Sequence, residues 1–176
     1  MNITPEREFL PGEFGPTNFD ERNRFTASGV FQFLHGFEIA PIFQASTARP
    51  FTPFAGSDID GDGRSTIDRA CRDGSFTLGC TEFPVNSFRG KTFIELDLRT
   101  AYAFKIRENM YIRIMWEMYN LFNRNNSCNF VDNSFYNSSN LPSGSFGAPQ
   151  GYCGGQGFGT TFGNAYRSQF GFRFEF

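Results

Sequence analysis

The chain has 176 residues, a formal net charge of −2, 39% hydrophobic residues and 19% charged residues. These proportions exclude a disordered tail and a charged coil. The near-neutral charge argues against nucleic acid as a partner, because phosphate binding needs clustered Lys and Arg. No apolar run approaches the roughly 18 residues of a membrane-spanning helix. The 25 phenylalanines and 19 glycines predict a β-rich protein with long polar loops.

The first residues, MNITPEREFLPGEFG, contain no basic start, apolar core or cleavage site, so no signal peptide is predicted. The four cysteines fall in two pairs within polar segments, Cys71 with Cys80 and Cys128 with Cys153, without C-x-x-C spacing. We therefore expect two disulfides and an oxidising compartment. The alternative is four free thiols in a reducing cytosol.

Apolar and polar residues alternate with the period of a β-strand in five segments. These are residues 24–33, 37–47, 93–106, 110–118 and 166–176. The second segment is the least regular, because Pro41 interrupts it and Ile42 lies on its polar side. The pattern predicts an all-β fold in which the five strands form an antiparallel meander.

The connections between these segments alternate between short and long. Residues 34–36 join the first strand to the second, and residues 107–109 join the third to the fourth. About 45 residues follow each of these two pairs. Short periplasmic turns and long extracellular loops are typical of outer-membrane β-barrels, and about ten residues suffice for a tilted strand to cross. Five strands are too few to close a barrel, so we expect the last five strands of a longer transmembrane barrel. The expected parts are an extracellular loop end (1–23), a hairpin (24–47), a long loop (48–92), a second hairpin (93–119), a second long loop (120–165) and a terminal strand (166–176).

The alternation assigns each side chain to one of two faces. The face expected to contact lipid contains Phe25, Phe31, Ile94, Leu96, Leu98, Phe104, Ile112, Ile114, Trp116, Phe170, Phe172 and Phe174. The face expected to line the lumen contains Glu95, Asp97, Arg99, Arg113 and Glu117. Such charged residues could line a permeation path, or they could pair with one another or with a plug. The residues Trp116, Tyr102, Tyr111 and Tyr119 are typical of an aromatic girdle at a bilayer interface.

The last eight residues fit the pattern polar-x-Gly-x-x-apolar-x-apolar of an outer-membrane assembly signal. Gln169, Gly171, Phe174 and Phe176 occupy its defined positions. A terminal aromatic residue on the lipid face gives the insertion machinery a strand edge of defined register. The alternative is an ordinary amphipathic strand that ends in Phe.

In its order and spacing of motifs, the sequence resembles the C-terminal end of TonB-dependent receptors, in the Oar-like branch with a carboxypeptidase-regulatory-like N-terminal domain. The stretches that carry the resemblance are FDERNRFTASGVF (19–31), GFEIAPIFQASTARPFT (36–52), DIDGDGRSTIDR (58–69), NSFRG (86–90), IELDLRTAYAFKI (94–106), WEMYNLFNRNN (116–126) and RSQFGFRFEF (167–176).

The resemblance implies a 22-stranded barrel with a plug in its lumen. It implies location in the outer membrane and TonB-driven uptake of a bulky substrate, a siderophore, a cobalamin or an oligosaccharide. The implied partners are the lipid bilayer, the barrel-assembly machinery and the rest of the barrel and plug. TonB would act only through parts that this sequence does not contain, since it has no TonB box and no plug.

The segment DIDGDGRSTIDR has chemistry of its own. Asp58, Asp60 and Asp62 alternate before Gly63, which is the order of ligands in a Ca²⁺ loop. The glycine permits a turn that would bring the carbonyl of Arg64 inward, and Asp68 would replace the usual final Glu. We regard Ca²⁺ as a possible ligand and expect no required cofactor. The alternative is a turn-rich loop in which Asp side chains cap their own backbone.

No sequence feature supports catalysis. The only histidine, His35, lies at a tight turn without a second ligand nearby, and no hydrolase, P-loop or zinc-protease motif is present. We therefore expect no enzyme. Two alternatives to the receptor remain open. One is a secreted, disulfide-pinned, Ca²⁺-binding β-sandwich that recognises a surface ligand, and the other is a small barrel assembled from several copies of this chain.

Overall fold

The computed structural model describes residues 12–132, 135, 143–152 and 165–176. The chain divides into two compact units. The sheet unit comprises Arg22–Thr47, Thr92–Asn126 and Tyr152–Phe176, and the loop unit comprises Met1–Glu21, Ala48–Lys91 and Ser127–Gly151. Among the described residues, no helix has the length and apolar character needed to span a membrane.

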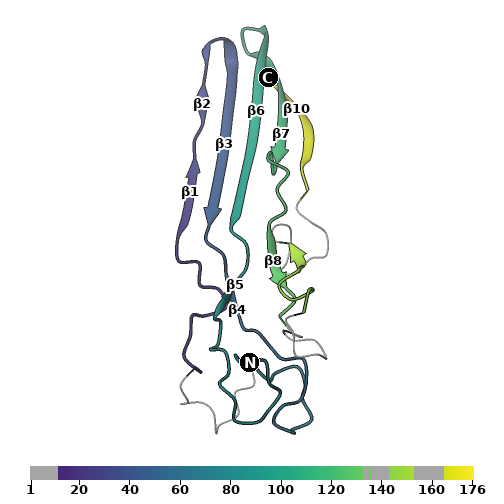
Figure 1. Ribbon diagram of the computed structural model, residues 1–176. Helices are drawn as coiled ribbons and strands as arrows, with labels where there is room; N and C mark the ends of the chain where they lie inside the picture. The colour runs from purple at the N-terminus through teal and green to yellow at the C-terminus, as the bar shows by residue number, and fades with distance from the viewer. Residues whose placement is uncertain (1–11, 133–134, 136–142, 153–164) are drawn as a thin grey trace. The chain divides into compact units, whose positions relative to one another are not determined.

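The sheet unit is an antiparallel meander, drawn in Figure 1, with the strand order β1-β3-β6-β7-β10. Its strands are β1 (Arg24–Ser28), β2 (Phe31–Gln32), β3 (Phe37–Ser46), β6 (Phe93–Arg107), β7 (Met110–Tyr119) and β10 (Arg167–Glu175). The short β2 continues the line of β1 along β3 with the same register. The predicted all-β, antiparallel fold is therefore confirmed.

The first strand is split because of a proline in its neighbour. The N–H of Gly29 donates to the carbonyl of Pro41 at 3.2 Å, so Pro41 directs its backbone toward the gap between β1 and β2. In an antiparallel ladder the N–H and C=O of one residue point to the same neighbour. Pro41 has no N–H to return, and regular pairing lapses at this point. The sequence predicted a single strand over residues 24–33, which the structure divides into β1 and β2, whereas β3 runs unbroken through Pro41.

Two short turns join the hairpins of the sheet. The first is a 3₁₀ turn, η1 (Leu34–Gly36), in which His35 has φ 69° and Gly36 has φ 81°. A side chain at Gly36 would meet the carbonyl oxygen of Ala103 at 3.0 Å, so both the conformation and the space favour glycine. The second turn occupies only residues 108 and 109, between β6 and β7. Both turns lie where the sequence predicted them.

The loop unit contains little regular structure but has an aromatic core. Two short two-stranded sheets frame it: β4 (Pro50–Phe51) pairs antiparallel with β5 (Phe88–Arg89), and β8 (Ser127–Phe130) pairs with β9 (Pro149–Tyr152). Their phenylalanines pack with others from the intervening segments at ring-centroid distances of 4.6 to 6.0 Å. The members of this phenylalanine core are Phe51, Phe83, Phe88, Phe130, Phe135 and Phe146.

Buried polar side chains fasten residues 12–21 to the rest of the loop unit. Arg69 donates to the carbonyl of Gly12 at 2.8 Å and forms ion pairs with Glu13 and Glu82 at 2.5 and 2.7 Å. The Asn86 amide donates to the carbonyl of Pro16 at 2.7 Å. Because Arg69 and Asn86 are themselves buried, their polar atoms need these partners, and the contacts fix the path of the N-terminal segment.

Candidate functional site

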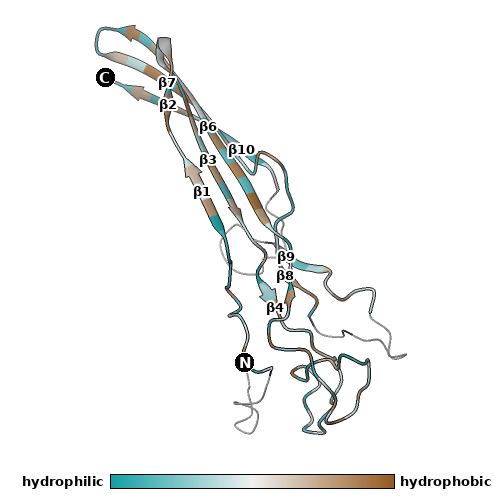
Figure 2. Ribbon diagram, turned by 60° about the vertical axis from the view of Figure 1, so that its left-hand side comes forward, coloured by the Kyte–Doolittle hydropathy of each residue, from teal (hydrophilic) through white to brown (hydrophobic). Residues whose placement is uncertain are grey.

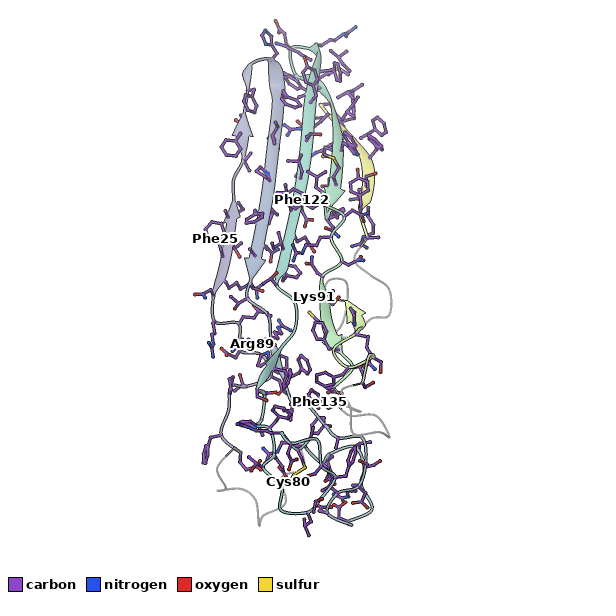
Figure 3. The ribbon with its side chains drawn as sticks, in the orientation of Figure 1. Phe25, Cys80, Arg89, Lys91, Phe122 and Phe135 are labelled. Carbon is purple, nitrogen blue, oxygen red and sulfur yellow. A yellow bond between two sulfur atoms is a disulfide. The ribbon has the colours of Figure 1, made fainter. Side chains whose placement is uncertain are left out.

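One face of the sheet is apolar and lies open. The strand registers place all the residues expected to contact lipid on this same face. Many of them are exposed, including Phe170 at 67%, Phe172 at 75% and Trp116 at 39% of their accessible surface. Figure 2 shows the hydrophobic and hydrophilic positions alternating along the strands, and Figure 3 shows Phe25 projecting from β1. Because soluble proteins rarely expose a large contiguous apolar patch, such a face marks an interaction surface, for a membrane or for another protein.

Aromatic rings pair along this apolar face. The rings of Trp116 and Phe170 are stacked, with centroids 5.5 Å apart and an interplanar angle of 9°. The residues are direct cross-strand partners in β7 and β10. Phe25 in β1 and Phe43 in β3 are diagonal neighbours, because the direct partner of Phe25 is Ala45, and their rings are tilted by 57° with centroids 6.1 Å apart. Such cross-strand pairs hold the register of the sheet even where neither ring is covered.

The opposite face is polar, and its charges pair with one another. The registers place Glu95, Asp97, Arg99, Arg113 and Glu117 together on this face. Arg99 lies opposite Glu117 with a nitrogen–oxygen distance of 3.9 Å. Glu117 also accepts hydrogen bonds from Gln169 and, at 3.2 Å, from Tyr119. The face is thus lined by a network of opposite charges rather than by a field of one sign.

The terminal strand presents the residues of the expected assembly signal. Gln169 and Gly171 lie on the polar face of β10, whereas Phe174 lies on the apolar face beside Ile112. Phe176 follows the end of β10 and is 94% exposed. A side chain at Gly171 would meet the terminal methyl of Met115 at 3.2 Å, so the glycine leaves room for that side chain.

The segment 58–69, called the acidic loop from here on, brings three of the predicted Ca²⁺ ligands together. Carboxylate oxygens of Asp58, Asp60 and Asp62 all lie within 4.8 Å of one another. Two oxygens that bind the same Ca²⁺ ion at about 2.4 Å can be no farther apart than about twice that distance, and the three carboxylates meet this condition. Both oxygens of Asp58 also accept backbone hydrogen bonds, from Gly61 at 2.7 Å and from Gly63 at 2.9 Å.

The other two predicted Ca²⁺ residues, Asp68 and Arg64, form hydrogen bonds within the loop. Asp68 lies outside the cluster of three and accepts hydrogen bonds from the backbone of Ile59 at 2.5 Å and Asp60 at 3.3 Å. Burial raises the pKa of the Asp68 carboxyl above its usual value, against the effect of these hydrogen bonds. Arg64, which was expected to offer its carbonyl, donates its N–H to Asp62 at 2.8 Å. Asp68 therefore supports the loop by accepting hydrogen bonds from the backbone of Ile59 and Asp60.

The structure contains the Cys71–Cys80 disulfide, which closes a loop next to the acidic segment in the sequence. Figure 3 shows this bond beside the label of Cys80. Cys128 is also disulfide-bonded. Its expected partner, Cys153, lies outside the described residues.

Two buried asparagines, which the sequence analysis did not single out, complete the end of the sheet unit. The amide of Asn126 accepts from the N–H of Ile94 at 3.1 Å and donates to its carbonyl at 2.9 Å. The N–H of Asn120 donates to the carboxylate of Asp97, and the side-chain amide of Asn120 donates to the carbonyl of Arg124 and accepts from its N–H. Both asparagines are 0% exposed. The only sequence signal was their place in the NLFNRNN stretch that follows the fourth strand.

Comparison with known proteins yields no relative for this chain. A scan against protein-family models, a search of curated proteins and a search of solved structures each found no match.

Proposed function

We propose that this chain forms part of the wall of an outer-membrane β-barrel, in a TonB-dependent receptor that takes up a bulky substrate. One observation carries the proposal. The sheet exposes a continuous apolar face, and the charged side chains on its opposite face form ion pairs with one another. The role is structural and concerns transport, without a catalytic step. The substrate class remains that of the resemblance, a siderophore, a cobalamin or an oligosaccharide.

The distribution of side chains favours lipid over water on the apolar side. A water-soluble antiparallel sheet turns its apolar face to a core and its polar face to solvent. A barrel in the outer membrane turns its apolar face outward and its polar face to the lumen. Three strands have the 9–11 or so residues that a tilted strand needs to cross, since β3 and β7 have 10 residues each and β10 has 9, whereas β6 has 15 and β1 has 5.

The open edges favour completion by strands of another segment. Neighbouring strands alternate in direction, so β1 and β10, the first and fifth strands of the sheet, run the same way. A second copy in the same orientation would place its β1 beside β10 in parallel, which an antiparallel barrel does not contain. An open edge in lipid leaves backbone groups without partners. This parity supports a wall completed by an odd number of further strands rather than by copies of the chain.

The remaining features fit the same proposal. Gln169, Gly171, Phe174 and Phe176 would present the assembly signal to the barrel-assembly machinery. The loop unit would lie outside the cell, where its disulfides are stable and where Ca²⁺ bound by Asp58, Asp60 and Asp62 would stiffen the acidic loop. A secreted β-sandwich has less support, because the other described ladders contain strands of only two and four residues.

The proposal is tested by asking which residues touch lipid. A photo-reactive phenylalanine analogue is placed at Phe172 or, as a matched control, at Arg173, and the receptor barrel proposed to contain this chain is produced in a Gram-negative host. These neighbours lie on opposite faces of β10. We expect the probe at position 172 to form lipid adducts in the outer membrane and the probe at 173 to form none. Equal labelling at both positions, or recovery of the protein only in soluble fractions, would refute the proposal.

A further inference from the structure

The loop unit contains three Asp–Gly dipeptides, which are chemically labile. They are Asp60–Gly61, Asp62–Gly63 and Asp73–Gly74. At such a site the glycine nitrogen attacks the side-chain Cγ of the preceding aspartate, and the nitrogen–carbon bond forms as a hydroxyl leaves with the amide proton as water. Addition of water to either carbonyl of the resulting succinimide gives aspartate or isoaspartate. The sequence of steps restores the composition and needs no oxidant or reductant.

Two of the three attacking nitrogens are held by one carboxylate. The N–H of Gly61 donates to one oxygen of Asp58 at 2.7 Å, and the N–H of Gly63 donates to the other at 2.9 Å. Hydrogen bonds to a charged acceptor are among the stronger ones in proteins. Each bond must break before its nitrogen can lose the proton and turn toward Cγ.

The carboxyl groups that would be attacked are also engaged. Asp60 accepts from the N–H of Asp62 at 3.1 Å, and Asp62 accepts from the N–H of Arg64 at 2.8 Å. These Asx turns direct each side chain toward the backbone two residues further along rather than toward the next nitrogen. Both partners of the reaction are therefore restrained.

We propose that Asp58 protects Asp60 and Asp62 from conversion to isoaspartate. Conversion would insert the side-chain methylene into the main chain and move the carboxylate, so it would destroy the spacing of the acidic loop. The proposal depends on the hydrogen bonds of the loop alone and stands whether or not the chain lies in a membrane.

The third dipeptide provides an internal reference. The N–H of Gly74 donates to the carbonyl of Cys71 at 3.2 Å, and Asp73 accepts from the N–H of Ser75 at 2.9 Å. Neither contact involves Asp58. Removal of the Asp58 carboxylate should leave the rate at Asp73 unchanged.

The experiment compares the unmodified chain with Asp58→Ala during ageing in heavy-oxygen water with a chelator present. Each succinimide that hydrolyses takes up one heavy oxygen atom, so mass spectrometry of peptides counts the events at each aspartate. We expect the rate at Asp60 and Asp62 to rise by roughly tenfold or more, because a bond to a charged acceptor is lost, with no change at Asp73. No rise at either residue would overturn the proposal.

A second variant separates direct protection from loosening of the loop. Asp68→Ala removes the acceptor of the Ile59 and Asp60 amides but leaves the bonds from Gly61 and Gly63 to Asp58 in place. We expect Asp68→Ala to raise the rates at Asp60 and Asp62 much less than Asp58→Ala does. Equal rises in the two variants would show that general rigidity protects the loop, and would overturn the assignment to Asp58.

Discussion

The guanidinium of Arg113 in β7 lies 3.7 Å from the carboxylate of Glu38 in β3, across the intervening strand β6. The registers explain this reach, because β6 presents Ala103 opposite Arg113 and Ala101 opposite Glu38. Two small side chains on the polar face of β6 thus let charges on its two neighbours meet. Arg113 also lies 3.8 Å from Glu175 in β10, so one arginine joins charges from three strands.

The Arg113–Glu38 pair should couple only weakly. Both side chains are partly accessible, and ion pairs of this kind typically contribute about 0.2–1 kcal/mol. In a double-mutant cycle of Glu38→Gln and Arg113→Gln, we expect a coupling free energy within that range from urea unfolding in lipid vesicles. A coupling well above it would mean that the polar face is far less hydrated than this exposure indicates.

A charge on the apolar face should destabilise the protein in lipid far more than loss of a charge on the polar face. Leu98→Arg is expected to lower the free energy of unfolding in vesicles by about 2–4 kcal/mol if the residue lies near the bilayer midplane. Arg99→Leu, one residue further along β6 and on the other face, is the matched control and should have a much smaller effect. Similar losses in both variants would count against burial of this face in hydrocarbon.

Asn126 should be important for the stability of the sheet unit, although it belongs to no strand of that unit. Its side chain bonds the N–H and the carbonyl of Ile94 just as a neighbouring strand would. Asn126→Ala leaves both groups without their partner, and we expect unfolding to become easier by about 2–3 kcal/mol, measured by denaturant titration with Trp116 fluorescence. The exposed neighbour Asn125, replaced by Ala, should change stability little.

The strands could be predicted from sequence because their alternation of apolar and polar residues has only one structural explanation. Residues such as Leu98 and Arg99 had to face opposite ways once a strand was assumed. The phenylalanine core of the loop unit carried no such signal, because Phe51, Phe88 and Phe146 are isolated in segments without a period. Their contacts depend on long-range packing that no local pattern encodes.

Side chains that take the place of a backbone hydrogen-bond partner could not be predicted from the sequence either. Asn126 is one of several asparagines in a polar stretch, and nothing local distinguishes it from its exposed neighbour Asn125. The alternation predicted one strand over residues 24–33 and gave no sign of the gap between β1 and β2. Pro41 interrupts the alternation of its own segment, but its structural effect falls on the neighbouring strand, since Pro41 has no N–H to donate to Gly29.

Calcium should stabilise the acidic loop through three carboxylates. We expect Ca²⁺ to slow proteolysis between Ile59 and Asp68 in the isolated protein, and Asp60→Asn to abolish most of this protection, because a neutral ligand weakens the site. Asp73→Asn, outside the cluster, should retain full protection. If Ca²⁺ changes neither proteolysis nor heat release in calorimetry, the loop is held by its own hydrogen bonds alone.

The pH dependence of the loop without calcium should reflect the buried carboxyl of Asp68. Burial raises its pKa above the ordinary 3.8, so between that value and the raised one the folded loop binds more protons than the unfolded chain. The contribution of Asp68 to stability is therefore fully present below pH 3.8 and is lost as the pH rises through the raised pKa. Asp68→Asn keeps an oxygen acceptor without the charge.

We therefore expect Asp68→Asn to make the loop more stable than the unmodified chain at neutral pH in chelator, and equally stable in acid. Asp73 provides the opposite case, because the hydrogen bond from the backbone of Ser75 lowers its pKa. Its contribution is present above the ordinary pKa and is lost as the pH falls through the lowered one. The difference in loop stability between Asp68→Asn and the unmodified chain is measured by hydrogen exchange of the Ile59 and Asp60 amides, corrected for intrinsic rates. Slower exchange in Asp68→Asn at neutral pH supports a costly buried charge, whereas faster exchange would mean that the ionised carboxylate holds these amides at a net gain.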